Sequence, residues 1–142
     1  MAILAGCAPS SPRPAAPAPP QGELEHNMRN CPSSLAGSST RATNTEAGVD
    51  LEITAADPAV QQKIVELATM HEKMGDPDGS AMEHTGLHGG PGVIGHCPII
   101  HAATIVSVTR IGNGAMVHLR AVAPDGVAKL QAGVAERVAG LH

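Results

Sequence analysis

Side chains able to bind a soft metal ion gather in one part of this sequence. Histidine, methionine and cysteine recur between residues 70 and 101, a stretch that holds five of the eight histidines. Imidazole suits zinc, copper and nickel, whereas thioether and thiolate groups select Cu(I) in particular. The members of this group are Met70, His71, Met74, Met82, His84, His88, His96, Cys97 and His101. The mixture predicts a soft-metal site, with copper favoured and zinc as the alternative.

A smaller group of the same residue types lies upstream and consists of His26, Met28 and Cys31. If the fold brings Cys31 and Cys97 together, the two groups could share one ion. The predicted metal ligands are therefore His71, Met74, His84, His88, His96, Cys97, His26, Met28 and Cys31. The spacing matches no C-x-x-C pair, H-E-x-x-H helix or EF-hand loop, so the prediction rests on residue type and clustering.

Several of these residues also have an ordinary structural interpretation. Met70 and Met74 are four residues apart on a predicted helix, where methionine often fills gaps in a core. His71 continues the apolar stripe of that helix, so it is as well suited to a buried position with a backbone partner as to a metal. For His84 and His88, surrounded by glycine, we favour metal contact over an incidental place in a polar loop.

The chain repeats itself beyond its N-terminal region. Cys31-Pro32 and Cys97-Pro98 are 66 residues apart (97 − 31 = 66). The same shift, without gaps, superposes Ala36 on Ala102, Thr43 on Thr109, Gly48 on Gly114, Leu51 on Val117, Ile53 on Leu119, Ala55 on Ala121, Pro58 on Pro124, Lys63 on Lys129, Ile64 on Leu130 and Ala68 on Val134. We interpret this as a tandem duplication in which neither unit can bury its apolar face alone.

Each repeat carries the pattern of two strands followed by a helix. Residues 38–45 and 104–111 predict a first strand, and the glycines of 46–48 and 112–114 predict a hairpin turn with positive φ. Alternating apolar residues then mark a second strand, namely Val49, Leu51 and Ile53 in one repeat and Ala115, Val117, Leu119 and Ala121 in the other. Asp57-Pro58 and Pro124-Asp125 predict helix starts.

The predicted helices have apolar stripes made of Val60, Ile64, Leu67 and His71 and of Val127, Leu130, Val134 and Val138. Two such units predict an α+β fold, with two tandem β-β-α repeats forming a four-stranded antiparallel sheet and two helices on one face. A single domain would span 26–142, with repeats 31–74 and 97–142 joined by the glycine- and histidine-rich connection 75–96. A connection of that length suggests function or disorder.

The equivalent cysteines have a second chemistry besides metal binding. In an oxidising compartment Cys31 and Cys97 are natural disulfide partners, and the bond would stabilise the fold by about 3 to 4 kcal/mol. Thiolate ligation and free thiols are the alternatives. If the two cysteines pair, a metal site must rely on histidine and methionine.

The first seven residues end in Leu4-Ala5-Gly6-Cys7, which resembles the lipobox of bacterial lipoproteins. The resemblance covers these four residues and implies that Cys7 is lipidated and that the chain is anchored at the periplasmic face of the cell envelope. Since most of a signal peptide is missing before them, we interpret the start as truncated or misassigned. Residues 8–25, rich in proline and alanine, predict an extended tether.

Composition excludes several classes of function. The net charge is −4, the nine Lys and Arg are scattered, and Phe, Tyr and Trp are absent, which argues against nucleic-acid binding. No nucleophile or phosphate-binding motif is present, and Glu83 beside His84 is a poor general base for a metal hydrolase, so we expect no enzyme. We expect copper or zinc binding for sequestration, delivery or sensing. The alternative is a structural or partner-binding lipoprotein with no metal role.

Overall fold

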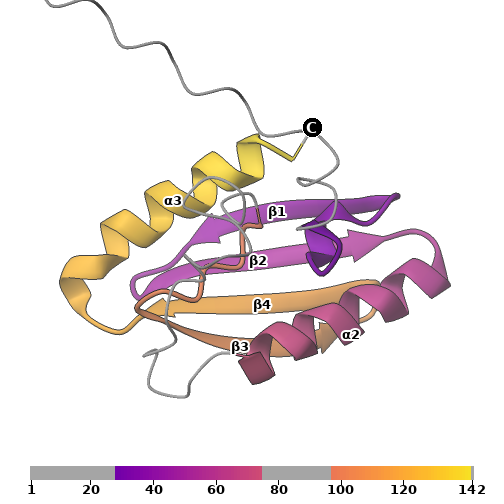
Figure 1. The fold of residues 1–142 in the computed structure, drawn as a ribbon, viewed down its shortest axis with the longest axis horizontal. Helices are drawn as coiled ribbons and strands as arrows, with labels where there is room; N and C mark the ends of the chain where they lie inside the picture. Colours follow the sequence, from indigo (N-terminus) through magenta and orange to yellow (C-terminus); the bar gives the residue numbers. More distant parts are fainter. Residues whose placement is uncertain (1–27, 75–96, 142) are drawn as a thin grey trace, which may run out of the picture.

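Two units of the same plan make up the part of the chain that the structure, a computed structural model, describes: residues 28–74 and 97–141. In chain order the elements are the 3-10 helix η1 (Pro32–Ser34), strands β1 (Ser38–Asn44) and β2 (Gly48–Ala55), helix α2 (Pro58–Met74), strands β3 (Thr104–Ile111) and β4 (Gly114–Ala121), the 3-10 helix η2 (Pro124–Gly126) and helix α3 (Val127–Ala139). The predicted α+β fold of two β-β-α units is confirmed (Figure 1). The predicted lipobox, tether and connection 75–96 lie outside the described residues.

The four strands form one antiparallel sheet in the order β1-β2-β4-β3, so β2 and β4 lie side by side at its centre. The register of this central pairing places Leu51 opposite Val117. The same two residues are equivalent under the 66-residue shift, so the pseudo-twofold axis relating the repeats passes through this pair. Each hairpin therefore contributes one central and one edge strand.

The glycines that begin β2 and β4 have a different role from the one predicted. Gly48 and Gly112 do not have positive φ, and Gly114, at 159°, is close to extended. A Cβ on Gly48 would lie 1.9 Å from the carbonyl oxygen of Leu119, and one on Gly114 would lie 2.0 Å from that of Ile53. The expectation of left-handed turn glycines was therefore wrong. Glycine is required because the central strands approach too closely for a side chain.

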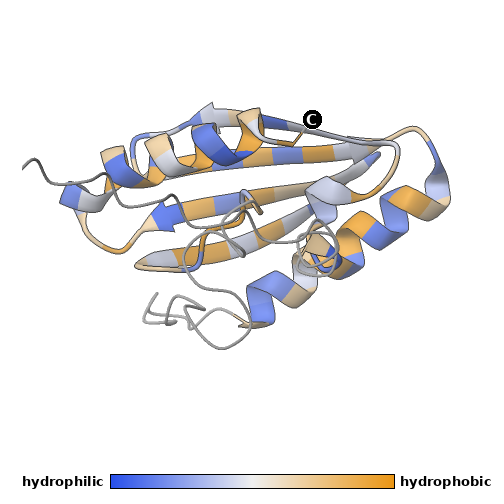
Figure 2. Cartoon of the chain, turned by 45° about the horizontal axis from the view of Figure 1, so that its top comes forward, coloured by the Kyte–Doolittle hydropathy of each residue, from blue (hydrophilic) through white to orange (hydrophobic). Residues whose placement is uncertain are grey.

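One face of the sheet and the two helices enclose an aliphatic core, to which the strands and helices contribute the predicted apolar stripes. Its buried members include Val49, Leu51, Ile53, Ile64, Ala68, Ala115, Val117, Leu119, Leu130 and Val134, together with Cys31, Cys97 and Ile99. Hydrophobic and hydrophilic residues alternate along the strands, as Figure 2 shows. Burial of apolar surface is the main stabilising contribution available to such a core, and it contributes about 25 cal/mol for each Å² buried.

Each helix covers mainly the hairpin of the other repeat. Helix α2 packs chiefly on β3 and β4, whereas α3 packs on β1 and β2 (Figure 1). The apolar face of each hairpin is thus buried by a helix from the other half of the chain. This packing agrees with the expectation that neither unit can bury its apolar face alone.

The two helices begin differently. Asp57 caps α2, because its Oδ1 accepts hydrogen bonds from the backbone N–H groups of Ala59 (2.7 Å) and Val60 (3.4 Å), as predicted. In the second repeat Pro124 opens the 3-10 turn η2, and the α-helix begins only at Val127. No side chain caps α3.

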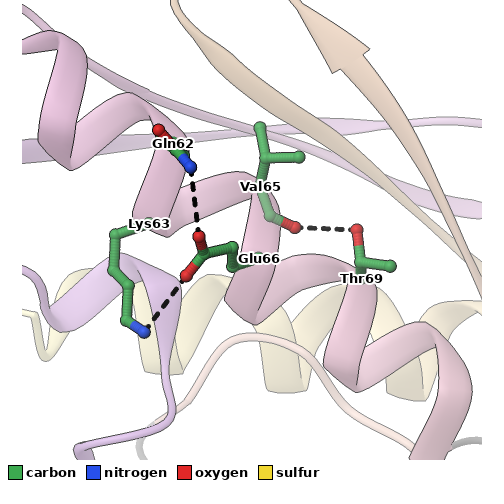
Figure 3. A network of polar contacts seen from close by, with 5 residues as sticks. All are labelled: Gln62, Lys63, Val65, Glu66 and Thr69. Carbon is green, nitrogen blue, oxygen red and sulfur yellow. Dashed lines mark hydrogen bonds and ion pairs between the residues drawn. The ribbon is translucent and has the colours of Figure 1, made fainter.

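The solvent face of α2 carries ordinary surface interactions. Glu66 accepts hydrogen bonds from Gln62 (3.4 Å) and Lys63 (3.2 Å), and the Thr69 hydroxyl donates to the Val65 carbonyl (Figure 3). An exposed ion pair of this kind contributes at most about 1 kcal/mol. These groups support the helix and leave its other side to carry the buried histidine described below.

Candidate metal centre

Cys31 and Cys97 meet inside the fold. Each begins a Cys-Pro segment that leads into the first strand of its repeat, so the pseudo-twofold places them at equivalent positions. Only 2% of Cys31 and 8% of Cys97 is exposed. Both are free cysteines in the same buried core cluster, and each side chain shifts the pKa of the other. The structure thus brings together two of the predicted ligands, and it does so as a buried pair of thiols without a disulfide bond.

The Cys31 sulfur sits where negative charge is stabilised. The hydrogen bond from Cys97 and those from the backbone N–H groups of Ser33 and Ser34, at the start of η1, lower the pKa of the Cys31 thiol against the opposing effect of burial. The segment is held in place because the Cys31 N–H donates to the Met28 carbonyl at 2.9 Å. The surroundings of Cys31 therefore favour the thiolate form of this side chain.

Cys97 has the opposite environment. Donation of its proton to Cys31, burial, and repulsion from a Cys31 thiolate raise the pKa of Cys97 well above its ordinary value. The backbone N–H of Ile99 and the positive charge of Arg137 offset part of this effect. Arg137 is held close because its guanidinium donates to the Cys97 carbonyl at 3.0 Å. Arg137 therefore places a positive charge close to Cys97.

Met28 is a third soft group at the same end of the molecule. Its side chain is partly buried and packs against the core cluster that contains both cysteines. Its carbonyl accepts hydrogen bonds from the Cys31 N–H and, at 2.6 Å, from the Ser34 hydroxyl. The predicted ligands Met28, Cys31 and Cys97 thus belong to one local unit.

His71, near the C-terminal end of α2, is buried with 8% exposure and uses both ring nitrogens. Its Nε2 donates to the Asn30 carbonyl at 2.8 Å, and its Nδ1 lies 2.9 Å from Nε2 of His101. The ring centroids are 5.2 Å apart with an angle of 14° between the planes. Because the nitrogen contact and the radii of the two rings account for that separation, the imidazoles meet edge to edge, and a hydrogen bond fits better than a face-to-face stack.

Burial lowers the pKa of His71 below its ordinary value, although donation to Asn30 opposes the shift. His71 is therefore neutral in the fold at neutral pH, the form that can bind a metal. As observed, however, the ring ties the end of α2 to the residue before Cys31 and to His101. The structural interpretation of His71, a buried histidine with a backbone partner, describes these contacts.

Of the remaining predicted ligands, the structure describes Met74 alone. Met74 ends α2 with 48% of its surface exposed. His26, His84, His88, His96 and the predicted lipidation site Cys7 lie outside the described residues. Within residues 28–74 and 97–141, no three His, Cys, Asp or Glu side chains converge closely enough to hold a metal ion. In this part of the chain the two thiols share one buried cluster, against which the Met28 side chain packs.

A polar cluster that the sequence did not predict lies on the open face of the sheet. Asp50 Oδ1 is 2.8 Å from His118 Nδ1, and His118 Nε2 is 3.2 Å from the Thr109 hydroxyl. When the His118 ring is neutral and its Nδ1–H donates to Asp50, Nε2 accepts from the hydroxyl, the order found in activated nucleophiles. We interpret this partly exposed cluster as cross-strand stabilisation. The alternation of polar and apolar residues in β2 and β4 places these side chains on the open face of the sheet. That they are in contact can be inferred only from the register of the two strands.

No protein family, curated protein or solved structure matches this chain. None of the described helices is long and apolar enough to cross a membrane.

Proposed function

We propose that the protein binds a soft transition metal through Cys31 and Cys97, with Cu(I) favoured and zinc second, for sequestration, delivery or sensing. The observation that carries the proposal is the buried contact between these two thiols, which come from segments 66 residues apart. A metal ion that replaces the thiol protons would join the same two segments. A small core without aromatic side chains gains stability from such a link.

The surroundings suit a pair of thiolates holding a monovalent ion. Two thiolates and Cu(I) carry one net negative charge, which would be costly in an apolar core without compensation. The N–H groups of Ser33, Ser34 and Ile99 and the charge of Arg137 all act to stabilise negative sulfur.

Coordination number favours copper over zinc. Structural zinc sites almost always have four protein ligands. The described residues bring two thiols together and no third His, Cys, Asp or Glu beside them. Cu(I) accepts a low number of soft thiolate and thioether ligands, and the side chain of Met28, three residues before Cys31, packs against the cluster that contains both cysteines.

The decisive measurement is an anaerobic titration of the reduced full chain with Cu(I) in competition with a chromogenic chelator, and in parallel with Zn(II). We expect one equivalent of Cu(I) to bind, and thiolate-to-metal absorption in the ultraviolet is unobscured because the chain has no Tyr or Trp. Cys31→Ser and Cys97→Ser should each weaken Cu(I) binding at least about tenfold. Cys7→Ser removes a third thiol and is the matched control, expected to bind like wild type.

Two results would redirect the proposal. Failure of the reduced protein to bind either metal more tightly than about micromolar would favour the structural or partner-binding alternative. Loss of binding in a His84→Ala/His88→Ala variant, with full binding in both cysteine variants, would move the metal site to the connection 75–96.

We further propose that the protein is an exported lipoprotein anchored at the periplasmic face of a bacterial envelope. Leu4-Ala5-Gly6-Cys7 and the proline-rich residues 8–25 that follow it support this proposal. Mass spectrometry of protein extracted from its own envelope with detergent should find a diacylglyceryl group on Cys7 as the first residue. An unmodified Cys7 preceded by residues 1–6 would contradict it.

A further inference from the structure

A carboxylate from a helix reaches the outer edge of the sheet. The backbone N–H of Val108, in β3, donates to Glu72 Oε1 at 2.9 Å, and Glu72 belongs to α2. In an antiparallel pair, alternate residues direct their N–H groups toward the partner strand and the others direct them away. Because β3 ends the described sheet beside β4, the Val108 N–H is of the second kind. Thr104, four residues earlier, also donates outside the sheet, to the His101 carbonyl at 3.2 Å.

The composition of β3 favours pairing with a further strand. Six of its eight residues are β-branched, none is proline or glycine, and its single charged residue is Arg110. The other edge strand, β1, has two β-branched residues among seven and is otherwise made of serine, arginine, alanine and asparagine. Edge strands rich in β-branched residues and poor in charge are the ones that pair readily with another chain. Of the two edges, β3 is therefore the one that needs to be closed.

The two repeats differ at the position that closes this edge. Under the 66-residue shift, Val108 corresponds to Ala42 in β1 (108 − 66 = 42) and Glu72 corresponds to Val138 in α3 (72 + 66 = 138). Val138 is partly buried against the core and has no atom that can accept a hydrogen bond. The acceptor is therefore found only beside the β-branched edge strand. Its place follows the pairing tendency of the strand and not the symmetry of the repeat.

We propose that the outer edge of β3 is a self-association surface and that Glu72 keeps it closed in the monomer. The partner is a second copy of this chain, paired antiparallel through β3 about a twofold axis at Val108. The Glu72 carboxylate occupies the N–H group at the centre of that pairing, so the second copy binds only where this carboxylate has been removed or displaced. Nothing in this proposal depends on metal binding.

The residues of β3 are complementary to a second copy of themselves in this register. The two Val108 residues exchange two backbone hydrogen bonds at the centre. Ser107 and Thr109, both exposed, lie opposite Thr109 and Ser107 of the second copy, where hydroxyl side chains pair favourably. Arg110 lies opposite Val106, so the one charged residue does not face its own copy. Two four-stranded sheets thus become one continuous sheet.

The test measures the oligomeric state of the full chain carrying Cys7→Ser by sedimentation equilibrium in the presence of a reductant. We expect this parent protein to be monomeric and its Glu72→Ala variant to dimerise, with a dissociation constant at least about tenfold below that of the parent. Glu72→Gln keeps an oxygen that accepts from the Val108 N–H and should behave like the parent. Glu66→Ala removes the same charge from the solvent face of the same helix and is the matched control, expected to remain monomeric.

A second variant and a second measurement locate the interface. Adding Val108→Pro to Glu72→Ala removes the central N–H, and proline is tolerated where an edge strand directs its N–H outward, so this protein should be monomeric again. Hydrogen exchange of the Glu72→Ala dimer should show the amides of Val106 and Arg110 protected relative to the parent monomer. Circular dichroism checks that each variant folds, and where the proline variant does not, hydrogen exchange alone decides.

Three results would overturn the proposal. The first is a Glu72→Ala variant that is no more associated than Glu66→Ala. The second is a Glu72→Ala dimer whose β3 amides exchange as fast as in the monomer, because that dimer would use another surface. The third is a parent protein that already pairs through β3, since Glu72 would then not keep the edge closed.

Discussion

His71 is a titratable group in a place that disfavours its charge. One ring nitrogen donates to Asn30 and the other meets His101, so that the side chain links the end of α2 to both Cys-Pro segments. If His71 took up a second proton, its Nδ1–H would face Nε2 of His101. Where that nitrogen also carries a proton, the two N–H groups would repel each other. The neutral ring is therefore part of what holds the two segments together.

Stability should depend on pH through this residue. The folded protein lowers the pKa of His71 below its ordinary value of about 6.5, so the unfolded chain takes up the proton at a higher pH than the folded one. The free energy of unfolding should be highest above about pH 6.5 and decrease as the pH falls from there toward the lowered pKa. Urea unfolding at a series of pH values, followed by circular dichroism, measures this. In His71→Gln that part of the pH dependence should vanish, and an unchanged slope would contradict the prediction.

For single residues, the sequence predicted which side chains would be noteworthy better than it predicted which side chains would be in contact. The repeat marked Cys31 and Cys97 as equivalent, which is why their meeting could be expected. The contact of His71 with His101 could not, because it joins a helix end to a loop and depends on where α2 crosses the sheet. Asp50 and His118 were missed for the same reason: their contact requires the β2–β4 register.

The central strands show how an element's geometry constrains single positions. Where β2 and β4 begin, a glycine of each strand lies against the backbone of the other. The hairpin pattern correctly placed the strands and turns. It wrongly explained these glycines by turn conformation. The close approach of the β2 and β4 backbones involves both repeats, so the sequence of one repeat cannot predict it.

Alanine at these positions should be strongly destabilising. Gly48→Ala and Gly114→Ala place a Cβ within 1.9 and 2.0 Å of a carbonyl oxygen, so the central strands must move apart. We expect each to lower the free energy of unfolding by about 2 kcal/mol or more. Gly112→Ala, whose Cβ would meet nothing within 4 Å, is the matched control and should change stability by less than about 0.5 kcal/mol. Denaturant unfolding checks all three, and equal losses at Gly48 and Gly112 would refute the close-approach explanation.

In the molecule as a whole, the helix of each repeat packs mainly on the hairpin of the other repeat. Duplication predicted that the halves depend on each other, and alternation predicted the sheet's inner face. Two features were not predicted: the strand order β1-β2-β4-β3 and the packing of each helix on the hairpin of the other repeat. The sequence repeat predicts that each apolar face is buried, but it does not predict which element buries it. Both features were visible only in the structure, in which β2 pairs with β4 through Leu51 and Val117.

Separated halves should show this dependence directly. Peptides 28–74 and 97–141 should each lack a cooperative thermal transition as monomers, since each hairpin loses the helix that covers it. Mixing them should restore a cooperative transition, measured by circular dichroism with size-exclusion chromatography to follow association. A cooperative transition of either peptide as a monomer would show that a repeat has a core of its own.

The axis through Leu51 and Val117 also bears on how two unlike cysteines can arise. A single ancestral unit pairing with its own copy around that axis would present one cysteine twice, in identical surroundings, and neither sulfur could differ from the other in acidity. Once one polypeptide encodes both copies, the residues after each Cys-Pro are free to diverge, to Ser33-Ser34 in one and Ile99-Ile100 in the other. Encoding both units in one chain therefore allows the surroundings of Cys31 and Cys97 to differ.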